Sequence, residues 1–159
     1  MNRRKVLKIL LGVSLLILLS LIYYVSEETI IEKETKIVTK IIDGDTIVVQ
    51  GGQTIRLLDI DCDERGKTCY DDAKEYIETR LLNSEVELVS GSEDEDIYNR
   101  KLRYIFLNGV NINQELVEKG YCVARFVSDN EFKAEIENAE SYAISNRIGC
   151  KWGNLRLNK

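Results

Sequence analysis

The chain has 159 residues, which is enough for one compact domain and a short additional segment but not for two ordinary domains. It contains no histidine, which excludes Ser-His-Asp and Cys-His catalysis, His-ligated zinc and histidine general bases. The formal net charge is −5. All charges in residues 1–25 are basic, so the remainder carries 18 basic and 27 acidic residues. A remainder this acidic is not a general electrostatic binder of nucleic acid.

An uncharged apolar run extends from Ile9 to Val25. With residues 6–8 included, it predicts a transmembrane helix over residues 6–25, about 30 Å long, after a basic cytoplasmic tail at residues 1–5. Basic residues precede the run and acidic residues follow it, so the C-terminal domain is expected outside the cell, anchored to the membrane. The alternative is a cleaved signal peptide and a secreted domain.

The remainder of the chain alternates between strand and helix patterns after a short polar stalk at residues 26–35. Period-two alternation predicts strands at residues 37–42, 46–50, 54–60, 85–89, 101–107 and 121–127. Helical spacing predicts helices at residues 69–82, 112–119 and 132–143. Loops are expected at residues 61–68 and 92–96. We therefore expect an α+β domain at residues 36–154, built as a small β-barrel with helices packed on it, and a tail at residues 155–159.

Acidic side chains crowd the turns and loops beside the predicted strands. They are Asp43, Asp45, Asp59, Asp61, Asp63 and Glu64. Converging carboxylates repel each other, and either protonation or a hard cation relieves the repulsion; ligands that are all oxygen favour Ca²⁺ or Mg²⁺. Together with Arg56 and Arg100, these carboxylates would form a phosphoryl-transfer site, in which a bound metal ion and guanidinium groups neutralise the charge of the phosphate. For Asp43, a purely structural role in the hairpin turn is an equal alternative.

Simple strand geometry sets a condition on this site. Period two places Arg56 and Asp61 on opposite faces of a strand. Both side chains can reach one site only if the strand bends or ends between them, near Asp59.

Several short motifs occur in a fixed order along the domain. They are Asp43-Gly44-Asp45-Thr46, Ile55-Arg56-Leu57-Leu58-x-Ile60-Asp61-x-x-Glu64, Tyr98-x-Arg100, Asn108-Gly109, Gly120-Tyr121 and Gly149–Trp152. The series resembles the staphylococcal nuclease (thermonuclease) family over roughly residues 36–153. The resemblance implies a five-stranded OB-type β-barrel with three helices. It also implies a calcium-dependent endonuclease, a phosphodiesterase that acts on DNA and/or RNA and leaves 3′-phosphates.

The resemblance also implies a Ca²⁺ site. Asp45 and Asp61 would supply carboxylate ligands, and Cys62 would supply its backbone carbonyl. The family's usual Thr-Pro at this point is Cys62-Asp63 here. The backbone ligand survives that change, but the loss of proline is expected to free the loop that carries Glu64.

Catalytic and substrate-binding roles are carried over in the same way. Glu64 would activate the attacking water, while Arg56 and Arg100 would bind the scissile phosphate and stabilise its charge. Tyr98 would contact the substrate near the phosphate, or else pack in the core. The family's usual Tyr-Gly-Arg is Tyr98-Asn99-Arg100 here, and asparagine tolerates the positive φ that such a turn needs.

The four cysteines form an even set in a domain expected outside the membrane, which makes disulfides plausible. Of the three possible connectivities, we favour Cys62–Cys69 with Cys122–Cys150. The first bond would tether the loop that lost its proline, and the second would fix the C-terminal segment to a strand.

Two other functions compete with a nuclease. The acidic run at residues 92–96 replaces the basic residues of the family's substrate loop, which predicts weak substrate binding and a high KM. A catalytically weak or inactive binding module of the same fold is therefore one alternative, and a calcium-stabilised extracellular interaction domain is another. The nuclease hypothesis implies no protein partner, and a monomer is expected.

Overall fold

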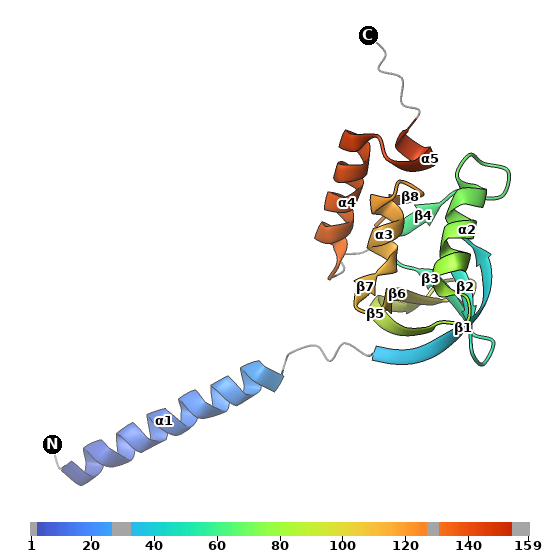
Figure 1. The fold of residues 1–159 in the computed structure, drawn as a ribbon. Helices are drawn as coiled ribbons and strands as arrows, with labels where there is room; N and C mark the ends of the chain where they lie inside the picture. Colours follow the sequence, from blue (N-terminus) through green and yellow to red (C-terminus); the bar gives the residue numbers. More distant parts are fainter. Residues whose placement is uncertain (1–2, 27–32, 127–130, 154–159) are drawn as a thin grey trace. The chain divides into compact units, whose positions relative to one another are not determined.

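The structure is a computed structural model of the chain and describes residues 3–26, 33–126 and 131–153. The chain separates into two compact units, Met1–Ile31 and Glu32–Lys159. The first unit contains one helix, α1 (Arg3–Ser26), shown in blue in Figure 1.

The predicted membrane anchor falls within the first unit. Within the described ranges, no helix combines the length and the apolar character needed to cross a membrane. This finding does not support the transmembrane helix predicted over residues 6–25. Of the predicted stalk, residues 27–32 lie outside the described residues, and residues 33–35 belong to the first strand of the second unit. The predicted tail at residues 155–159 also lies outside them.

The second unit is built on a closed barrel of five strands. They are β1 (Lys33–Asp43), β2 (Thr46–Val49), β3 (Thr54–Leu57), β5 (Glu85–Glu95) and β6 (Lys101–Leu107). The sheet order is β3-β2-β1-β5-β6-β7, and a parallel pairing of β3 with β6 closes the barrel. The short strand β7 (Val110–Asn111) extends the sheet beyond β6. A separate antiparallel pair joins β4 (Ile60–Cys62) to β8 (Cys122–Ala124). The predicted α+β fold with a five-stranded barrel is confirmed.

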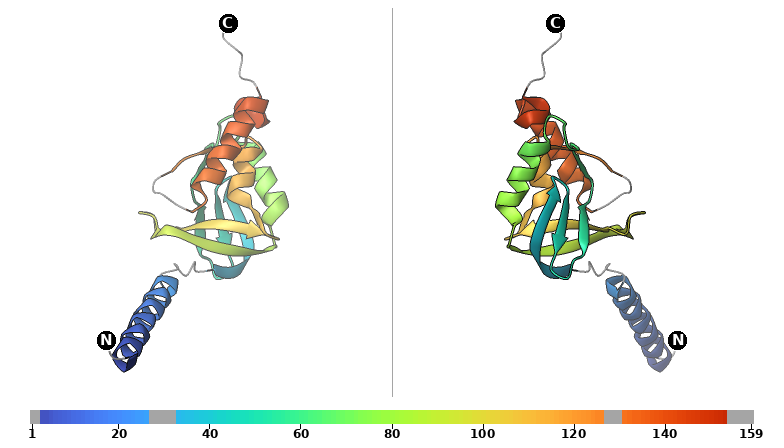
Figure 2. Two further views of the ribbon diagram at one scale, coloured as in Figure 1. Left: turned by 90° about the vertical axis from the view of Figure 1, so that its left-hand side faces the viewer. Right: turned by 90° about the vertical axis from the view of Figure 1, so that its right-hand side faces the viewer.

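In the described part of the second unit, four helices accompany the barrel. They are α2 (Tyr70–Leu81), α3 (Ile112–Glu118), α4 (Lys133–Asn146) and the short α5 (Gly149–Trp152). Figures 1 and 2 show α3, α4 and α5 gathered at one end of the barrel, where α3 packs against both β6 and α4. The buried residues of α2 recur every three or four positions, as predicted, and the helix packs against β1. The α2, α3 and α4 helices are the three that the sequence predicted.

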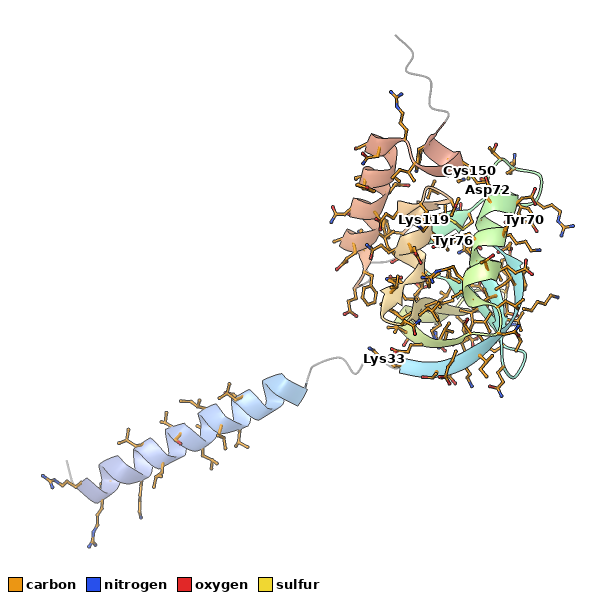
Figure 3. All side chains as sticks on the ribbon, in the orientation of Figure 1. Lys33, Tyr70, Asp72, Tyr76, Lys119 and Cys150 are labelled. Atoms are coloured by element: carbon orange, nitrogen blue, oxygen red, sulfur yellow. A yellow bond between two sulfur atoms is a disulfide. The ribbon has the colours of Figure 1, made fainter. Side chains whose placement is uncertain are left out.

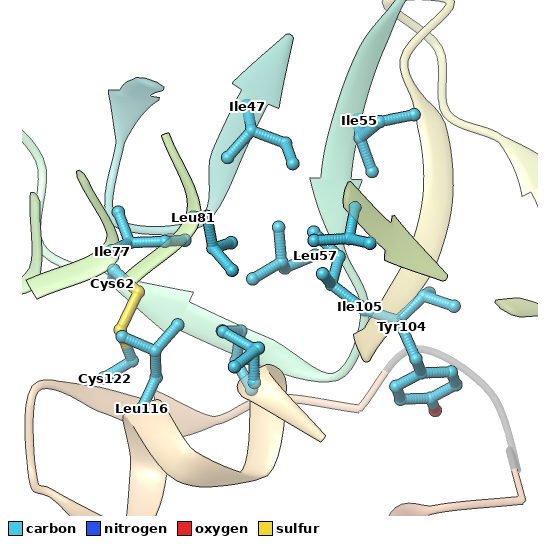
Figure 4. Close-up of a cluster of buried hydrophobic side chains, with 14 of the residues drawn as sticks. Ile47, Ile55, Leu57, Cys62, Ile77, Leu81, Tyr104, Ile105, Leu116 and Cys122 are labelled. Carbon is cyan, nitrogen blue, oxygen red and sulfur yellow. A yellow bond between two sulfur atoms is a disulfide. The ribbon is translucent and has the colours of Figure 1, made fainter. Parts of the chain in front are cut away.

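The core lies between the barrel strands and the helices. Figure 4 shows Ile47, Ile55 and Leu57 from the strands converging with Ile77 and Leu81 from α2. All five are at most 1% exposed, so each contributes about 1.5–3 kcal/mol through burial of apolar surface. This core fixes β2 and β3, the strands that border the candidate site.

The third predicted strand, residues 54–60, is interrupted in the structure. β3 ends at Leu57 and β4 begins at Ile60, with Asp59 at a φ of 60° between them. The wholly buried Asn113 of α3 holds this turn, because its Nδ2 donates to the carbonyl oxygens of Leu58 (2.9 Å) and Arg103 (3.3 Å). The strand therefore ends where the geometry required, and side chains on either side of the turn reach one site.

The acidic segment at residues 92–96 is largely exposed to solvent, as predicted, but most of it is strand rather than the predicted loop. β5 continues to Glu95, which pairs with Lys101 of β6 after an irregularity in register that follows Ser90. The β5–β6 hairpin projects from the barrel in both views of Figure 2, in olive and yellow. Basic side chains of β6 explain the extension: Asp94 forms ion pairs with Lys101 and Arg103, and Glu95 forms one with Lys101.

The two disulfides are Cys62–Cys122 and Cys69–Cys150, so the predicted connectivity is wrong. The antiparallel register of β4 and β8 places Cys62 directly opposite Cys122, and their bond borders the core in Figure 4. Cys150, in α5, lies close to the beginning of α2 in Figure 3, beside which Cys69 stands. Long-range packing, rather than loop closure, thus decides the pairing.

Candidate active site

An open pocket of about 510 Å³ lies between the β1–β2 turn, the β3–β4 turn and the β5–β6 hairpin. Among its lining residues are the five whose side chains were predicted to form the site, namely Asp45, Arg56, Asp61, Glu64 and Arg100. These residues come from segments that are up to 55 positions apart in the sequence. The fold therefore brings the predicted side chains to one place.

Asp45 is the most deeply buried acid of this group. It lies in the turn between β1 and β2, and its Oδ2 accepts a hydrogen bond from the Cys62 backbone N–H at 2.8 Å. Burial raises the pKa of Asp45 to about 6, although the Arg56 guanidinium acts in the opposite direction. Asp43, whose Oδ1 accepts from the Asp45 N–H, supports the turn and also lines the pocket. Asp45 therefore takes up a proton near pH 6.

Arg56 joins the two acids that the sequence assigned to a metal. Its Nη2 lies 3.1 Å from Asp45 Oδ2 and 3.4 Å from Asp61 Oδ1. Its Nη1 donates to the Leu57 carbonyl oxygen at 2.8 Å, which fixes the plane of the guanidinium. One cationic group thus holds the two carboxylates near each other and keeps their mutual repulsion low.

Asp61 lies on β4 with its two oxygens held by different arginines. Oδ1 faces Arg56, and Oδ2 accepts from Arg125 Nη1 at 2.8 Å. Cys62, its neighbour on β4, is buried, and its side chain is committed to the disulfide. Only the backbone of Cys62 is left for the ligand role that was predicted.

Arg100 is positioned by the turn that closes the β5–β6 hairpin. Asp96 Oδ1 accepts from the backbone N–H of Tyr98 (2.9 Å) and of Arg100 (3.0 Å), while its Oδ2 accepts from Arg100 Nε at 2.7 Å. Asn99 has a φ of 59°, as the turn was predicted to require. Tyr98 is 72% exposed, which excludes the predicted core packing, and its ring centroid lies 5.5 Å from Arg100 Cζ.

Glu64 is exposed at the pocket, in the segment between β4 and α2. The residue that replaced the family's proline anchors this segment. Asp63 Oδ1 accepts from Lys151 Nζ at 2.6 Å, and its Oδ2 accepts from the Cys69 backbone N–H at 2.9 Å. Partial burial acts to raise the pKa of Asp63, but these two donors outweigh it and lower the pKa. The segment is therefore tied to α5 at two points, Lys151 and Cys150, and is not freed.

The charges of the pocket favour a bound cation. Its lining holds eight carboxyl groups and three guanidinium groups. The metal ligands that the carboxyl groups offer are all oxygen atoms, which suit a hard cation such as Ca²⁺ or Mg²⁺ better than zinc or copper. In the described part of the chain, no group of three or more His, Cys, Asp or Glu side chains is placed to hold a metal ion. Asp45 and Asp61 would therefore need backbone or water oxygens to complete a coordination shell.

Comparison with known proteins assigns the chain that forms this pocket to a family. Residues 54–153, well over half of the chain, match the family described as "Staphylococcal nuclease homologue". The chain belongs to the staphylococcal nuclease family. The matched range contains Arg56, Asp61, Glu64 and Arg100, and Asp45 lies just before it.

Three relatives match most of this family member. The thermonuclease of Staphylococcus hyicus is 29% identical over an alignment of 121 residues, covering 70% of this chain and 72% of the relative. The thermonuclease of Staphylococcus intermedius is 29% identical over 134 residues, covering 76% of this chain and 77% of the relative. A protein of Haemophilus influenzae named as an uncharacterized endonuclease is 31% identical over 136 residues, covering 82% and 75%.

In this member of the staphylococcal nuclease family, two residues of the site were not predicted. Asp96 was assigned to a solvated acidic loop, yet it positions Arg100. Its place four residues before Arg100, at a turn, was the available signal. Arg125 lines the pocket and binds Asp61. It is the first residue after β8, and only the pairing of β8 with β4 brings it to the site.

The raised pKa of Asp45 predicts that its contribution to the stability of the folded state decreases as the pH rises. A folded-state pKa near 6, above the ordinary 3.8, gives a contribution that is fully present below pH 3.8 and lost as the pH rises through 6. Without divalent metal, Asp45→Asn should unfold like the parent at pH 4 but be about 3 kcal/mol more stable at pH 7. Urea unfolding of both proteins in chelator across this range measures the difference. A difference that stays constant with pH would contradict the shift.

Proposed function

We propose that the protein is a Ca²⁺-dependent nuclease that hydrolyses phosphodiester bonds in DNA and/or RNA and leaves 3′-phosphates. The observation that carries the proposal is the single pocket shared by Asp45, Arg56, Asp61, Glu64 and Arg100. Membership of the staphylococcal nuclease family and relatives named thermonuclease and endonuclease support a nuclease-type enzyme.

In this proposal, Asp45, Asp61 and the backbone carbonyl of Cys62 hold the cation. Bound Ca²⁺ would supply positive charge that offsets the many pocket carboxylates and neutralises the substrate phosphate. Arg56 draws the two carboxylates together, and an ion that binds Asp45 Oδ2 and Asp61 Oδ1 would replace the Arg56 Nη2 that now contacts both oxygens.

The remaining residues act on the phosphodiester directly. Arg56 and Arg100 donate hydrogen bonds to the nonbridging phosphate oxygens, whose charge grows as the phosphorus is attacked. Backbone contacts hold both residues in place, through the Leu57 carbonyl for Arg56 and through Asp96 for Arg100. Glu64 orients the attacking water and accepts its proton.

The test uses the full chain with single-stranded DNA at low salt, in Ca²⁺ or in EGTA. We expect cleavage in Ca²⁺ only, with products that a polymerase extends only after phosphatase treatment, because a 3′-phosphate blocks extension. Binding without cleavage would instead support a catalytically inactive module. Neither binding nor cleavage would support an interaction domain.

The two disulfides support a place for the domain on the outer side of the cell membrane. Such bonds form and persist in oxidising compartments and are rare in the cytosol. We therefore expect alkylation of the protein, as isolated from cells without reductant, to label none of its four cysteines. Labelling of all four would place the domain in a reducing compartment.

A further inference from the structure

Arg125 has no role in the proposed chemistry, yet the fold directs it into the same pocket. Its backbone N–H donates to the Asp59 carbonyl oxygen at 2.9 Å, which continues the β4–β8 pairing past Ala124 and fixes the start of its side chain. Its Nη1 then reaches Asp61 Oδ2 at 2.8 Å. Arg125 is therefore held against the proposed metal ligand through Oδ2, the carboxylate oxygen that Arg56 does not contact.

The three guanidinium groups of the pocket differ in how far they are already engaged. The Arg56 side chain is 16% exposed and contacts Asp45, Asp61 and a backbone carbonyl. The Arg100 side chain is 30% exposed and its Nε is bound to Asp96. The Arg125 side chain is 67% exposed. A guanidinium carries five N–H donors in a rigid plane, so Arg125 can keep its bond to Asp61 and still offer donors to an anion.

The rest of the pocket determines where a second anion is accepted. On the hairpin side three carboxylates, Glu93, Glu95 and Asp96, outnumber the single guanidinium of Arg100, so this side is the less favourable one for a second phosphate. On the β8 side the lining includes Arg125. A polyanionic strand that enters the pocket is therefore favoured to leave it past β8.

We propose that Arg125 binds the phosphate next to the scissile one and so sets the path of the substrate strand. This inference rests on the proposed nuclease function and adds a substrate contact to it. This contact requires a substrate strand with at least two phosphodiester groups. A single strand has them and is flexible enough to follow the pocket. Through Asp61, Arg125 also touches the metal site, so the test must separate a phosphate contact from mere positioning of Asp61.

The salt dependence of oligonucleotide binding distinguishes a phosphate contact of Arg125 from positioning of Asp61. Each phosphate contact on a single strand contributes about 0.7 to the slope of log K against log salt concentration. We would measure binding of a fluorescent oligothymidylate of about a dozen nucleotides to the full chain in Ca²⁺. Glu64→Gln serves as the parent, and gels confirm that the probe stays intact. Adding Arg125→Ala should raise Kd about tenfold at low salt and reduce the slope by about 0.7.

The matched control is Lys40→Ala. Lys40 is an exposed cation on β1 and does not line the pocket, so its removal changes net charge by the same amount. This control should leave the slope unchanged. An unchanged slope in Arg125→Ala with weakened Ca²⁺ binding would overturn the proposal and leave Arg125 as a positioning residue for Asp61. If the parent binds no oligonucleotide and the wild type cleaves none, the nuclease function itself fails, a result distinct from a slope that does not move.

Discussion

Replacing Glu64 by Gln should lower kcat for DNA cleavage by about 10²–10⁴-fold, because a positioned general base contributes that much to proton transfer. Glutamine has nearly the same shape but accepts no proton from the attacking water. Glu64 is exposed, so the substitution should change the free energy of unfolding by less than about 0.5 kcal/mol. The measurement is the rate of product formation under saturating single-stranded DNA in Ca²⁺, together with urea unfolding of the same samples.

Two companion variants make the result specific. Glu118→Gln removes a carboxylate at the exposed end of α3 and should cleave at the parental rate. Arg100→Ala should lose about 10²–10³-fold, because one donor to the developing phosphate charge disappears. Full activity in both Glu64→Gln and Arg100→Ala would show that the pocket is not the site of cleavage.

Local sequence patterns were sufficient for the barrel, and the ordered motifs of the family resemblance identified the residues that meet in the pocket. The Asp43-Gly44-Asp45 turn, the alternation of the following strands and the offset from Arg56 to Asp61 are short-range features, which the fold preserves. Strand geometry alone also required a break near Asp59, and the structure has a left-handed residue there. A pattern with a period of two is reliable wherever one face of a strand is buried.

The sequence failed where a contact depends on which distant strands become neighbours. The disulfide partners follow from the register of β4 against β8, which alternation along either strand leaves open. The same pairing brings Arg125 to Asp61. The acidic residues of the hairpin were predicted to form a loop because the cations that pair with them, Lys101 and Arg103, become neighbours only after β5 and β6 are aligned. Ion pairs and disulfide partners therefore cannot be assigned from the positions of charged residues and cysteines until the pairing of the strands is known.

Removing the Cys62–Cys122 disulfide should strongly destabilise the folded protein. The bond closes a segment with a sequence separation of 60, so its loss returns loop entropy to the unfolded chain worth about 4 kcal/mol. We expect this loss in urea unfolding of the Cys62→Ala/Cys122→Ala variant. Replacing Cys69 and Cys150 by Ala should cost nearly the same, because their separation of 81 enters only as a logarithm.

The two variants should nevertheless differ at the site. Cys62–Cys122 lies inside the β4–β8 pair, next to Asp61, and the Cys62 N–H binds Asp45. Cys69–Cys150 lies at the far end of the segment that carries Glu64. Under conditions where both variants stay folded, the first should weaken Ca²⁺ binding, measured by calorimetry, because the strand that presents Asp61 loses its covalent link. The second should bind Ca²⁺ like the parent. Equal Ca²⁺ affinity in all three proteins would mean that hydrogen bonds and packing alone hold Asp61 in place.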